Sequence, residues 1–300
     1  MTGAPSVTDT APAPGARTAT KTPRDAAGLI DLSPRNRGRE SVRKRVRFWS
    51  GWTLRVGVPV ALIALWQLAL TWGWTTEDVL PSPKTIVEAY QYLWNNGSLQ
   101  AAVPVSLRRA GEGLVLGGSA GLVLGIFAGL WKIGEEIFDA TLQMLRTVPF
   151  IALVPLFVTW FGIDEPSKLA LITAAALFPL YLNTFHAVKG VDQKLIEAGR
   201  TFGLSGFRIA RRIIFPTALP GILTGLRFAC SFSLLSLVLA EQVNSTAGIG
   251  YLIINAQNNQ RPDIVIAGIW IYAVLGILID FVMRGVERLV LPWRARVGIN

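Results

Sequence analysis

Residue types that carry covalent or metal chemistry are scarce in this sequence. Its 300 residues include one histidine, His186, and one cysteine, Cys230, which lies inside an apolar run. These two cannot build a disulfide framework, a zinc cluster or a convergent nucleophile and base. A Gly-x-x-x-x-Gly-Lys-Ser/Thr phosphate loop is also missing, because Thr20 rather than glycine precedes Lys21. We therefore expect no catalytic residue, no metal site and no cofactor bound by this chain.

The remaining candidates for chemistry are ionisable residues within or beside apolar segments: Arg146, Arg227, Glu241 and Asp280. A charge at the centre of a bilayer costs roughly 2.5–3.5 kcal/mol on insertion scales, so such residues face a protein interior or reach an interface. We expect Arg227 to extend to the cytoplasmic interface and Glu241 to lie at an outer helix end. Asp280 is expected to be structural, and for Arg146 an interfacial role and a role on a solute path are both open.

The elements that must position these residues are membrane spans. Half of the residues are apolar (51%), only 16% are charged and the mean hydropathy is +0.44. Six segments are apolar and long enough to cross a hydrocarbon core of about 30 Å. These segments are 56–74, 113–131, 137–161, 169–185, 222–240 and 264–283. The sequence thus predicts an all-α membrane protein with six transmembrane helices, in a membrane domain over 51–300 that carries a cytoplasmic arm at 189–220.

Lysine and arginine predict the orientation of these spans. With the N-terminus inside, twenty-one of them fall in cytoplasmic parts and three outside, at Lys84, Lys168 and Arg261. By the positive-inside rule both termini and the arm are cytoplasmic. The net charge of +10 then reflects topology, and no nucleic-acid partner is expected.

The first fifty residues differ from the rest of the chain. They hold ten Lys/Arg against four acids and are rich in Ala, Pro, Thr and Gly. Such a composition predicts a disordered basic tail. No apolar stretch occurs before Val56, so we do not interpret this tail as a signal peptide.

Glycine recurs at every fourth position of the second predicted span. A helix with this repeat has a ridge without side chains, which permits close backbone approach to another helix in lipid. We expect this ridge to pack in the middle of the bundle or against a symmetry mate, with a sliding surface during transport as the functional alternative. The ridge consists of Gly113, Gly117, Gly121, Gly125 and Gly129.

The arm between the fourth and fifth spans is charged and amphipathic. Asp192 is expected to cap a first short helix, which ends at Gly203 in a left-handed conformation. Ser205 is expected to cap a second helix, which Pro216 and Pro220 close. An amphipathic loop lying on lipid headgroups is the alternative interpretation.

The spacing within this arm resembles the signature loop of ATP-binding-cassette (ABC) importer permeases. That consensus is Glu-Ala-Ala, three residues, Gly, nine residues, Ile, any residue, Leu, Pro. Two positions depart from it, with Gly199 in place of the second Ala and Phe215 in place of Leu. The residues assigned to the motif are Glu197, Ala198, Gly199, Gly203, Leu204, Ile213, Phe215 and Pro216.

Further segments are similar to the aliphatic-sulfonate branch of this family, whose relatives carry taurine, nitrate and bicarbonate. These segments are 80–83, 143–165 and 248–252, and the resemblance extends from Val56 to Trp293. It implies a multi-pass plasma-membrane protein with the six-helix fold of type I ABC importer permeases. The implied partners are a second copy of the chain, two cytoplasmic ABC ATPase subunits that bind ATP-Mg, and an extracytoplasmic solute-binding protein.

The resemblance also implies a use for the polar residues. In the family, the arm is a pair of coupling helices that docks in a groove of the ATPase. An anion crossing a low-dielectric medium needs positive or hydrogen-bonding groups along its path. We expect Arg146 near this path, lined by Gln143, Asn183, Ser233 and Ser236.

Two other classes of function are weighed against this interpretation. A secondary transporter driven by protons or sodium would show two matching halves with interrupted spans and intramembrane acids for the ion. No such repeat is visible, and Asp139, Glu241 and Asp280 are not spaced as a relay. A membrane enzyme would need the nucleophile and base that are missing.

Overall fold

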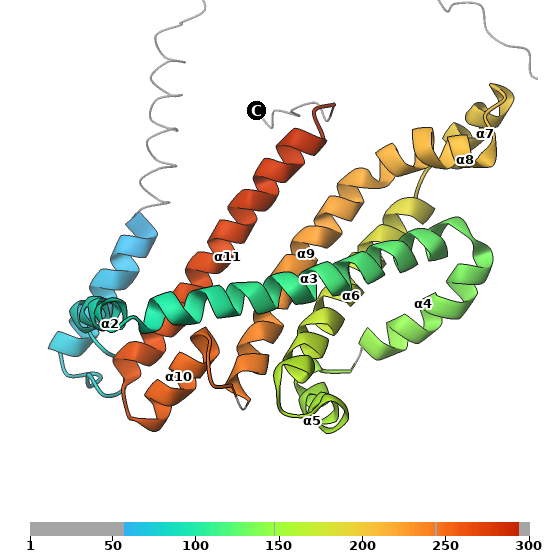
Figure 1. The fold of residues 1–300 in the computed structure, drawn as a ribbon. Coiled ribbons are helices and arrows are strands. Elements are labelled where there is room, and N and C mark those ends of the chain that lie inside the picture. The colour runs from blue at the N-terminus through green and yellow to red at the C-terminus, as the bar shows by residue number, and fades with distance from the viewer. Residues whose placement is uncertain (1–56, 147, 244, 294–300) are drawn as a thin grey trace, which may run out of the picture. The chain divides into compact units, whose positions relative to one another are not determined.

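Helices make up every regular element that the structure describes (Figure 1). This structure is a computed structural model, and it describes residues 57–146, 148–243 and 245–293. The chain divides into two units at Val60, and the elements discussed below belong to the second, from Ala61 onward. The basic tail expected over 1–50 lies outside the described residues.

The helices follow one another with short connections. Their order is α2 (Pro83–Asn95), α3 (Ser98–Leu130), α4 (Lys132–Arg146), α5 (Phe150–Phe161), α6 (Glu165–Lys189), α7 (Gln193–Thr201), α8 (Gly206–Ile209), the π-helical segment η2 (Ala210–Ile214), α9 (Phe215–Gln242), α10 (Ile249–Asn258) and α11 (Pro262–Val290). An apolar helix, Gly57–Thr71, precedes them.

Four helices of the described chain are long and apolar enough to cross a membrane. They correspond to α3, α6, the continuous helix Gly206–Gln242 and α11. The first predicted span, 56–74, is the shorter helix Gly57–Thr71. The prediction of one span over 137–161 is wrong, because the chain there forms two helices, α4 and α5. Pro149 stands directly before α5, and a proline disfavours a helical conformation in the residue before it. The count of six spans and the sidedness of the termini stay predictions.

The glycine ridge of α3 lies against α6. A Cβ atom at Gly117 would fall 2.1 Å from the carbonyl oxygen of Thr173, and one at Gly121 would fall 2.5 Å from that of Leu177. Gly113, Gly125 and Gly129 meet α6 in the same way. The ridge therefore packs within one copy of the chain, where the missing side chains let two backbones touch.

Helix α6 is packed closely on a second side as well. On α9, a Cβ at Gly221 would lie 2.5 Å from Cβ of Ala187, and one at Gly225 would lie 2.6 Å from Cβ of Asn183. Helices α3, α6 and α9 thus form a tightly packed group with α6 in contact with both neighbours. We call this group the α3–α6–α9 core.

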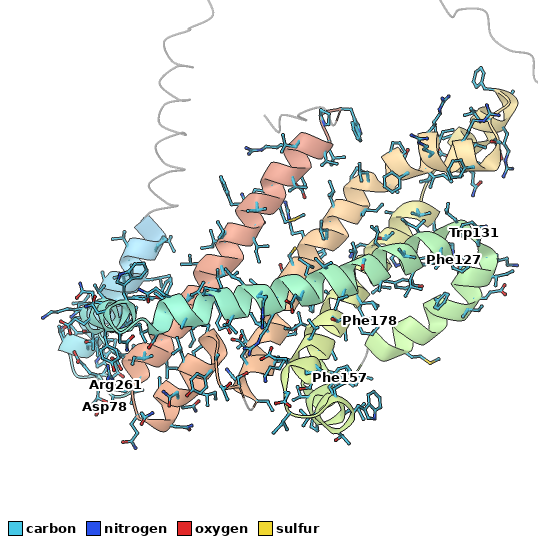
Figure 2. All side chains as sticks on the ribbon, in the orientation of Figure 1. Asp78, Phe127, Trp131, Phe157, Phe178 and Arg261 are labelled. Carbon is cyan, nitrogen blue, oxygen red and sulfur yellow. The ribbon has the colours of Figure 1, made fainter. Side chains whose placement is uncertain are left out.

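The turn from α3 into α4 is fixed by aromatic packing. The rings of Phe127 and Trp131 have centroids 5.0 Å apart, and Phe127 also contacts Phe138 of α4 (Figure 2). Gly134 gives room for this, since a Cβ there would fall 2.7 Å from the Phe127 ring.

At the other end of α3, the short helix α2 packs on α11, where the hydroxyl of Tyr90 donates to the carbonyl of Ala267 at 2.8 Å. Burial raises the pKa of the Tyr90 phenol.

The α3–α6 contact predicts different tolerances for two glycines of one helix. Gly121→Ala should lower the melting temperature in detergent by several degrees, because overpacking against backbone typically costs about 1–3 kcal/mol. Gly111→Ala should leave it unchanged or raise it, since no atom lies within 4 Å of a Cβ at this position. Equal effects of the two substitutions would show that α3 and α6 do not touch as described.

Candidate functional site

The arm begins where α6 ends, and it leads directly into α9 (Figure 1). Asp192 caps α7, its carboxylate accepting from the backbone N–H of Lys194 at 2.9 Å. The chain then reverses at Gly203, whose φ of +75° is the left-handed conformation that favours glycine. Ser205 stands before α8, but its side chain makes no cap hydrogen bond to the helix and instead accepts from Nε of Arg208 at 3.2 Å.

The interior of the arm is built from the motif residues themselves. Gly199 is buried, and a Cβ there would lie 2.6 Å from Cδ1 of Ile213 and 3.6 Å from Cδ1 of Leu204. The backbone N–H of Leu204 donates to the carbonyl of Gly199 at 3.0 Å. Glycine in place of the consensus alanine therefore lets α7 lie close to the π-helical segment.

The surface of the arm is aromatic and basic. Phe202 and Phe207 are 86% and 78% exposed, next to the exposed side chains of Glu197 and Ala198. Exposed arginines surround them: Arg200, Arg208, Arg211 and Arg212. Two large apolar side chains are thus exposed on an otherwise polar arm.

The predicted end of the second arm helix at Pro216 and Pro220 is wrong. The chain stays helical from Gly206 to Gln242. The π-helical segment widens the helix just before Pro216, and Phe215 donates to the carbonyl of Ala210, five residues earlier. Pro216 follows directly inside this continuous helix, where it removes one backbone hydrogen bond. The second part of the arm, α8 and the π-helical segment, is therefore continuous with α9.

A second site lies at the opposite end of α9, around the carboxylate of Glu241. This side chain is fully shielded from solvent. Arg109 of α3 donates to Oε1 at 2.8 Å, and the hydroxyl of Ser106 lies 2.7 and 2.8 Å from the two oxygens. The N–H of Gly250 donates to Oε2 at 2.9 Å, and the hydroxyl of Tyr272 does so at 3.1 Å. The buried charge is therefore fully partnered, as a low-dielectric interior requires.

Arg109 connects this carboxylate to two further segments. Its Nε donates to Glu165 Oε2 at 2.8 Å and its Nη2 to Glu165 Oε1, at the start of α6. Its Nη1 also donates to the carbonyl of Ala247 at 2.7 Å, in the loop before α10. The planar guanidinium uses its fixed array of donors to join three helices and a loop. We call this set the Glu241 network.

Two glycines allow the loop to lie over the carboxylate. Gly248 has a φ of +114°, and a Cβ there would fall 2.3 Å from Glu241 Oε1. A Cβ at Gly250 would fall 2.5 Å from Cβ of Glu241. Between them, the N–H of Ile249 donates to Ser106 at 2.9 Å. The segment 248–252, read from sequence as a family feature, is therefore shaped around Glu241.

Sequence reasoning placed Glu241 correctly at a helix end but missed its burial. It did not single out Arg109, Ser106 or Tyr272. The signal was present in Arg109, a charge just before the glycine ridge, but the predicted span began only at Gly113 whereas α3 begins at Ser98.

Three of the residues expected along a solute path form hydrogen bonds within their own helices. Ser233 and Ser236 are buried and donate to carbonyls of their own helix, at 2.8 and 3.1 Å. Asn183 donates to the carbonyl of Pro179 at 2.8 Å and faces α9. Gln143 and Arg146 belong to α4, and their side chains lie outside the described ones. The assignment of these five to a path stays a prediction.

Arg227 on α9 pairs with α11. Its Nη2 lies 2.9 Å from Glu287 Oε1, and its Nε lies 3.6 Å from Asp280 Oδ1. Asp280 is bonded in turn to Arg284. The expected interfacial arginine is thus part of an ion-pair cluster between two helices, in which Asp280 is structural.

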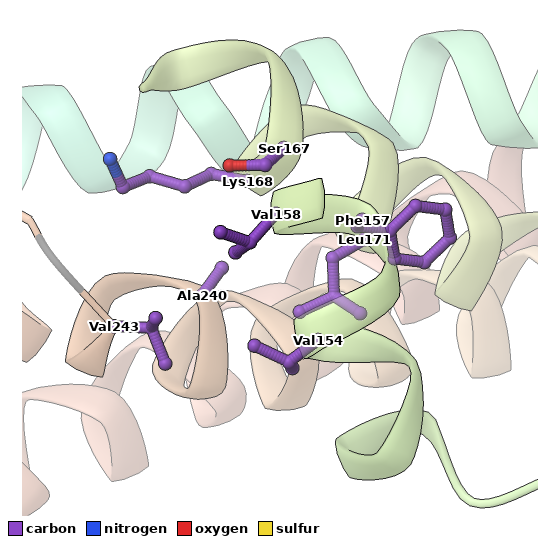
Figure 3. A pocket seen from close by; sticks show the side chains of 8 residues that line it. All are labelled: Val154, Phe157, Val158, Ser167, Lys168, Leu171, Ala240 and Val243. Atoms are coloured by element: carbon purple, nitrogen blue, oxygen red, sulfur yellow. The ribbon is translucent and has the colours of Figure 1, made fainter. Parts of the chain in front are cut away.

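A small hollow between α5, α6 and α9 is too small for a solute (Figure 3). Its volume of about 10 Å³ is enough for roughly one water molecule. Its walls include Val154, Val158 and Leu171, and Lys168 at its edge donates to the carbonyl of Ile163 at 3.4 Å. Among the described residues, no group of His, Cys, Asp and Glu could hold a metal ion.

Comparisons with known proteins define the family to which this chain belongs. Residues 121–292 match the family described as binding-protein-dependent transport system inner membrane component. The chain belongs to this family, and it is a permease of the ABC importer kind in the inner membrane. The resemblance inferred from the arm motif is thereby confirmed.

Individual relatives refine this placement. The chain is 43% identical over 256 residues to the putative aliphatic sulfonates transport permease SsuC of Bacillus subtilis, covering 85% of this chain and 93% of that protein. It is 32% identical over 250 residues to the taurine transport system permease TauC of Escherichia coli, covering 82% and 91%.

Among solved structures, a chain of the MetNI methionine ABC transporter matches with a TM-score of 0.55 and 18% identity, covering 70% of this chain and 98% of that one. This likeness confirms the predicted all-α permease fold.

The Glu241 network predicts a large loss of stability from one substitution. Glu241→Ala should cost about 3–5 kcal/mol, because it leaves a buried guanidinium short of a partner. The matched control is Glu112→Ala, also a helix carboxylate paired with an arginine, but exposed and 3.8 Å from Arg108. Removing that pair should cost less than about 1 kcal/mol. Melting curves of the purified protein in one detergent measure both, and similar shifts would contradict the burial of Glu241.

Proposed function

We propose that this chain is the permease subunit of an ATP-driven importer of aliphatic sulfonates. The observation that carries the proposal is the 43% identity to the sulfonate permease SsuC over 85% of the chain, which exceeds the 32% identity to the taurine permease. The motif arm, with its exposed Phe202 and Phe207, supports the coupling role.

The proposed partners supply ATP hydrolysis, the second half of the membrane domain and delivery of the solute. It has no phosphate loop of its own, so ATP-Mg is bound and hydrolysed by two separate cytoplasmic ATPase subunits, and this chain is not an enzyme. A second copy completes the membrane domain, and a two-fold pair can place a pathway on the symmetry axis. A solute-binding protein delivers the anion on the outer side.

The mechanism is alternating access driven through the arm. The arm continues without a break into α9, and α9 packs on α6 through Gly221 and Gly225. A push on the arm by closing ATPase subunits therefore tilts α6 and α9 together as one rigid body. At the far end of α9 the Glu241 network passes this motion to α10, α11 and the start of α6.

Gly203 provides a test of the coupling role. Gly203→Val should abolish co-purification of the ATPase subunits, because a β-branched residue is strongly disfavoured at a φ of +75° and the two arm helices would no longer be held in place. Gly206→Val is the control, since Gly206 has an ordinary φ and open space around its Cβ position. A stoichiometric complex of the Gly203→Val variant in a detergent pull-down would refute this role.

Uptake into vesicles that contain this chain and its cognate partners tests which solute is transported. Radiolabelled ethanesulfonate should accumulate when ATP is present, and excess unlabelled alkanesulfonate should compete more strongly than taurine, nitrate or bicarbonate. Stronger competition by one of the other three anions would assign the importer to that anion and contradict the sulfonate assignment.

A further inference from the structure

A large hollow lies among α9, α10 and α11, beside the Glu241 network. Its volume is about 950 Å³, within the range of about 300–1,000 Å³ that is typical of small-molecule sites. Val238 and Gln242 border it from α9, Gln257 from α10, and Gln260 and Arg261 from the turn that follows. We call it the glutamine pocket. In the orientation that lysine and arginine predict, it lies on the outer side, where solute arrives.

Three side-chain amides converge on this pocket. Gln242, Gln257 and Gln260 all border it, although they come from three different segments. All three side chains are exposed, and no hydrogen bond to another described residue occupies their amides. Each amide nitrogen offers two donors. Together they form a neutral set of donors that can bind an anion without holding it as tightly as a fixed positive charge would.

Gln260 occupies a position where the backbone favours glycine. Its φ is +51°, and it is the one non-glycine residue with positive φ among the described residues. The turn is closed by the backbone alone, with Arg261 N–H donating to the carbonyl of Ala256 at 2.9 Å. Glycine would satisfy this helix end at lower cost. A strained residue whose side chain borders a pocket points to a role for that side chain.

The charged groups beside the pocket are one arginine and two carboxylates. Arg261 donates to both carboxylate oxygens of Asp263, at 3.0 and 2.8 Å, and its guanidinium lies 5.5 Å from the ring centre of Tyr92. These hydrogen bonds raise the pKa of Arg261. Asp78 lies at the same end of the molecule and also borders the pocket (Figure 2). These three groups carry a net charge of −1, so the attraction for an anion must come from the amide donors, and a bound anion would be released readily.

Apart from Tyr272, the rest of the pocket wall is aliphatic. Val238, Ile253, Val265 and Ile269 line it. A ligand that suits this site has a compact anionic head for the amides and an alkyl tail for the wall. Nitrate has no tail, and the short tail of taurine ends in an ammonium group, which the aliphatic side chains of this wall cannot solvate.

We propose that the glutamine pocket is a binding subsite for alkanesulfonates on the outer side of the permease, with the sulfonate oxygens accepting from Gln242, Gln257 and Gln260. This inference rests on the proposed function and adds to it a place where the chain itself distinguishes alkanesulfonates from other anions.

Calorimetric titration of the purified full chain tests this subsite. The protein is held in nanodiscs of phosphatidylcholine, so that no anionic lipid competes, and is titrated with methanesulfonate, butanesulfonate, taurine and nitrate. Affinity should rise with tail length by about twofold to fourfold per methylene, and butanesulfonate should bind more tightly than taurine or nitrate. Phosphatidylglycerol in a second set of nanodiscs should leave butanesulfonate binding unchanged. No binding by the wild type, no dependence on tail length, or loss of binding with the anionic lipid would overturn the proposal.

Two variants distinguish loss of sulfonate binding at the subsite from a general loss of protein stability. Gln257→Leu should weaken butanesulfonate binding about tenfold, while Asn258→Leu, an exposed neighbour that does not border the pocket, should not. Gln260→Gly should also weaken binding, yet its melting temperature should stay unchanged or rise because glycine suits the positive φ. Equal affinity of Gln257→Leu and Asn258→Leu would overturn the proposal.

Uptake by the assembled importer shows whether only the sulfonate subsite is wrong or whether the proposed function is wrong as well. If vesicles with Gln257→Leu import alkanesulfonate at the wild-type rate, the subsite is refuted and the sulfonate importer stands. If wild-type vesicles import taurine or nitrate and no alkanesulfonate, the proposed solute is refuted, and the subsite with it.

Discussion

Close contact between the backbones of α3, α6 and α9 is the constraint on which the rest of the structure depends. Lipid offers little hydrophobic force between helices, so they associate where small residues let them approach. Glycines on α3 and α9 remove the side chains that would hold α6 away, at positions such as Gly121 and Gly225. Because α6 leads into the arm and α9 leads out of it, the two helices that flank the arm are packed against each other.

Burial of charge imposes the second constraint, at the far end of the same helices. Glu241 can be sealed from solvent only because Arg109, Ser106, Tyr272 and the N–H of Gly250 all reach it. Removing any one partner leaves a costly unpaired group, so these elements must move together or stay in place together. The glutamine pocket borders this network through Tyr272, which places the proposed sulfonate subsite next to the junction of α9, α10 and α11.

Patterns local in sequence predicted the structure better than pairings between distant segments. The ridge from Gly113 to Gly129 and the left-handed turn at Gly203 could be read from spacing, because helix period and backbone conformation are local properties. The contact of Arg109 with Glu241 joins residues 132 apart, and no local pattern indicates such a partner. The π-helical segment before Pro216 was missed because proline normally ends a helix, and a widened turn that accommodates it leaves no clear sequence signal.

If a separate ATPase drives transport by moving the arm, then ATP and not an ion gradient supplies the energy for uptake. Vesicles containing this chain, its ATPase subunits and the solute-binding protein are compared under two conditions, with ATP on the arm side or with an imposed proton or sodium gradient. We expect uphill accumulation of solute with ATP alone, and no accumulation when the ATPase subunits are left out. Accumulation driven by an ion gradient, in vesicles that contain only this chain, would contradict it.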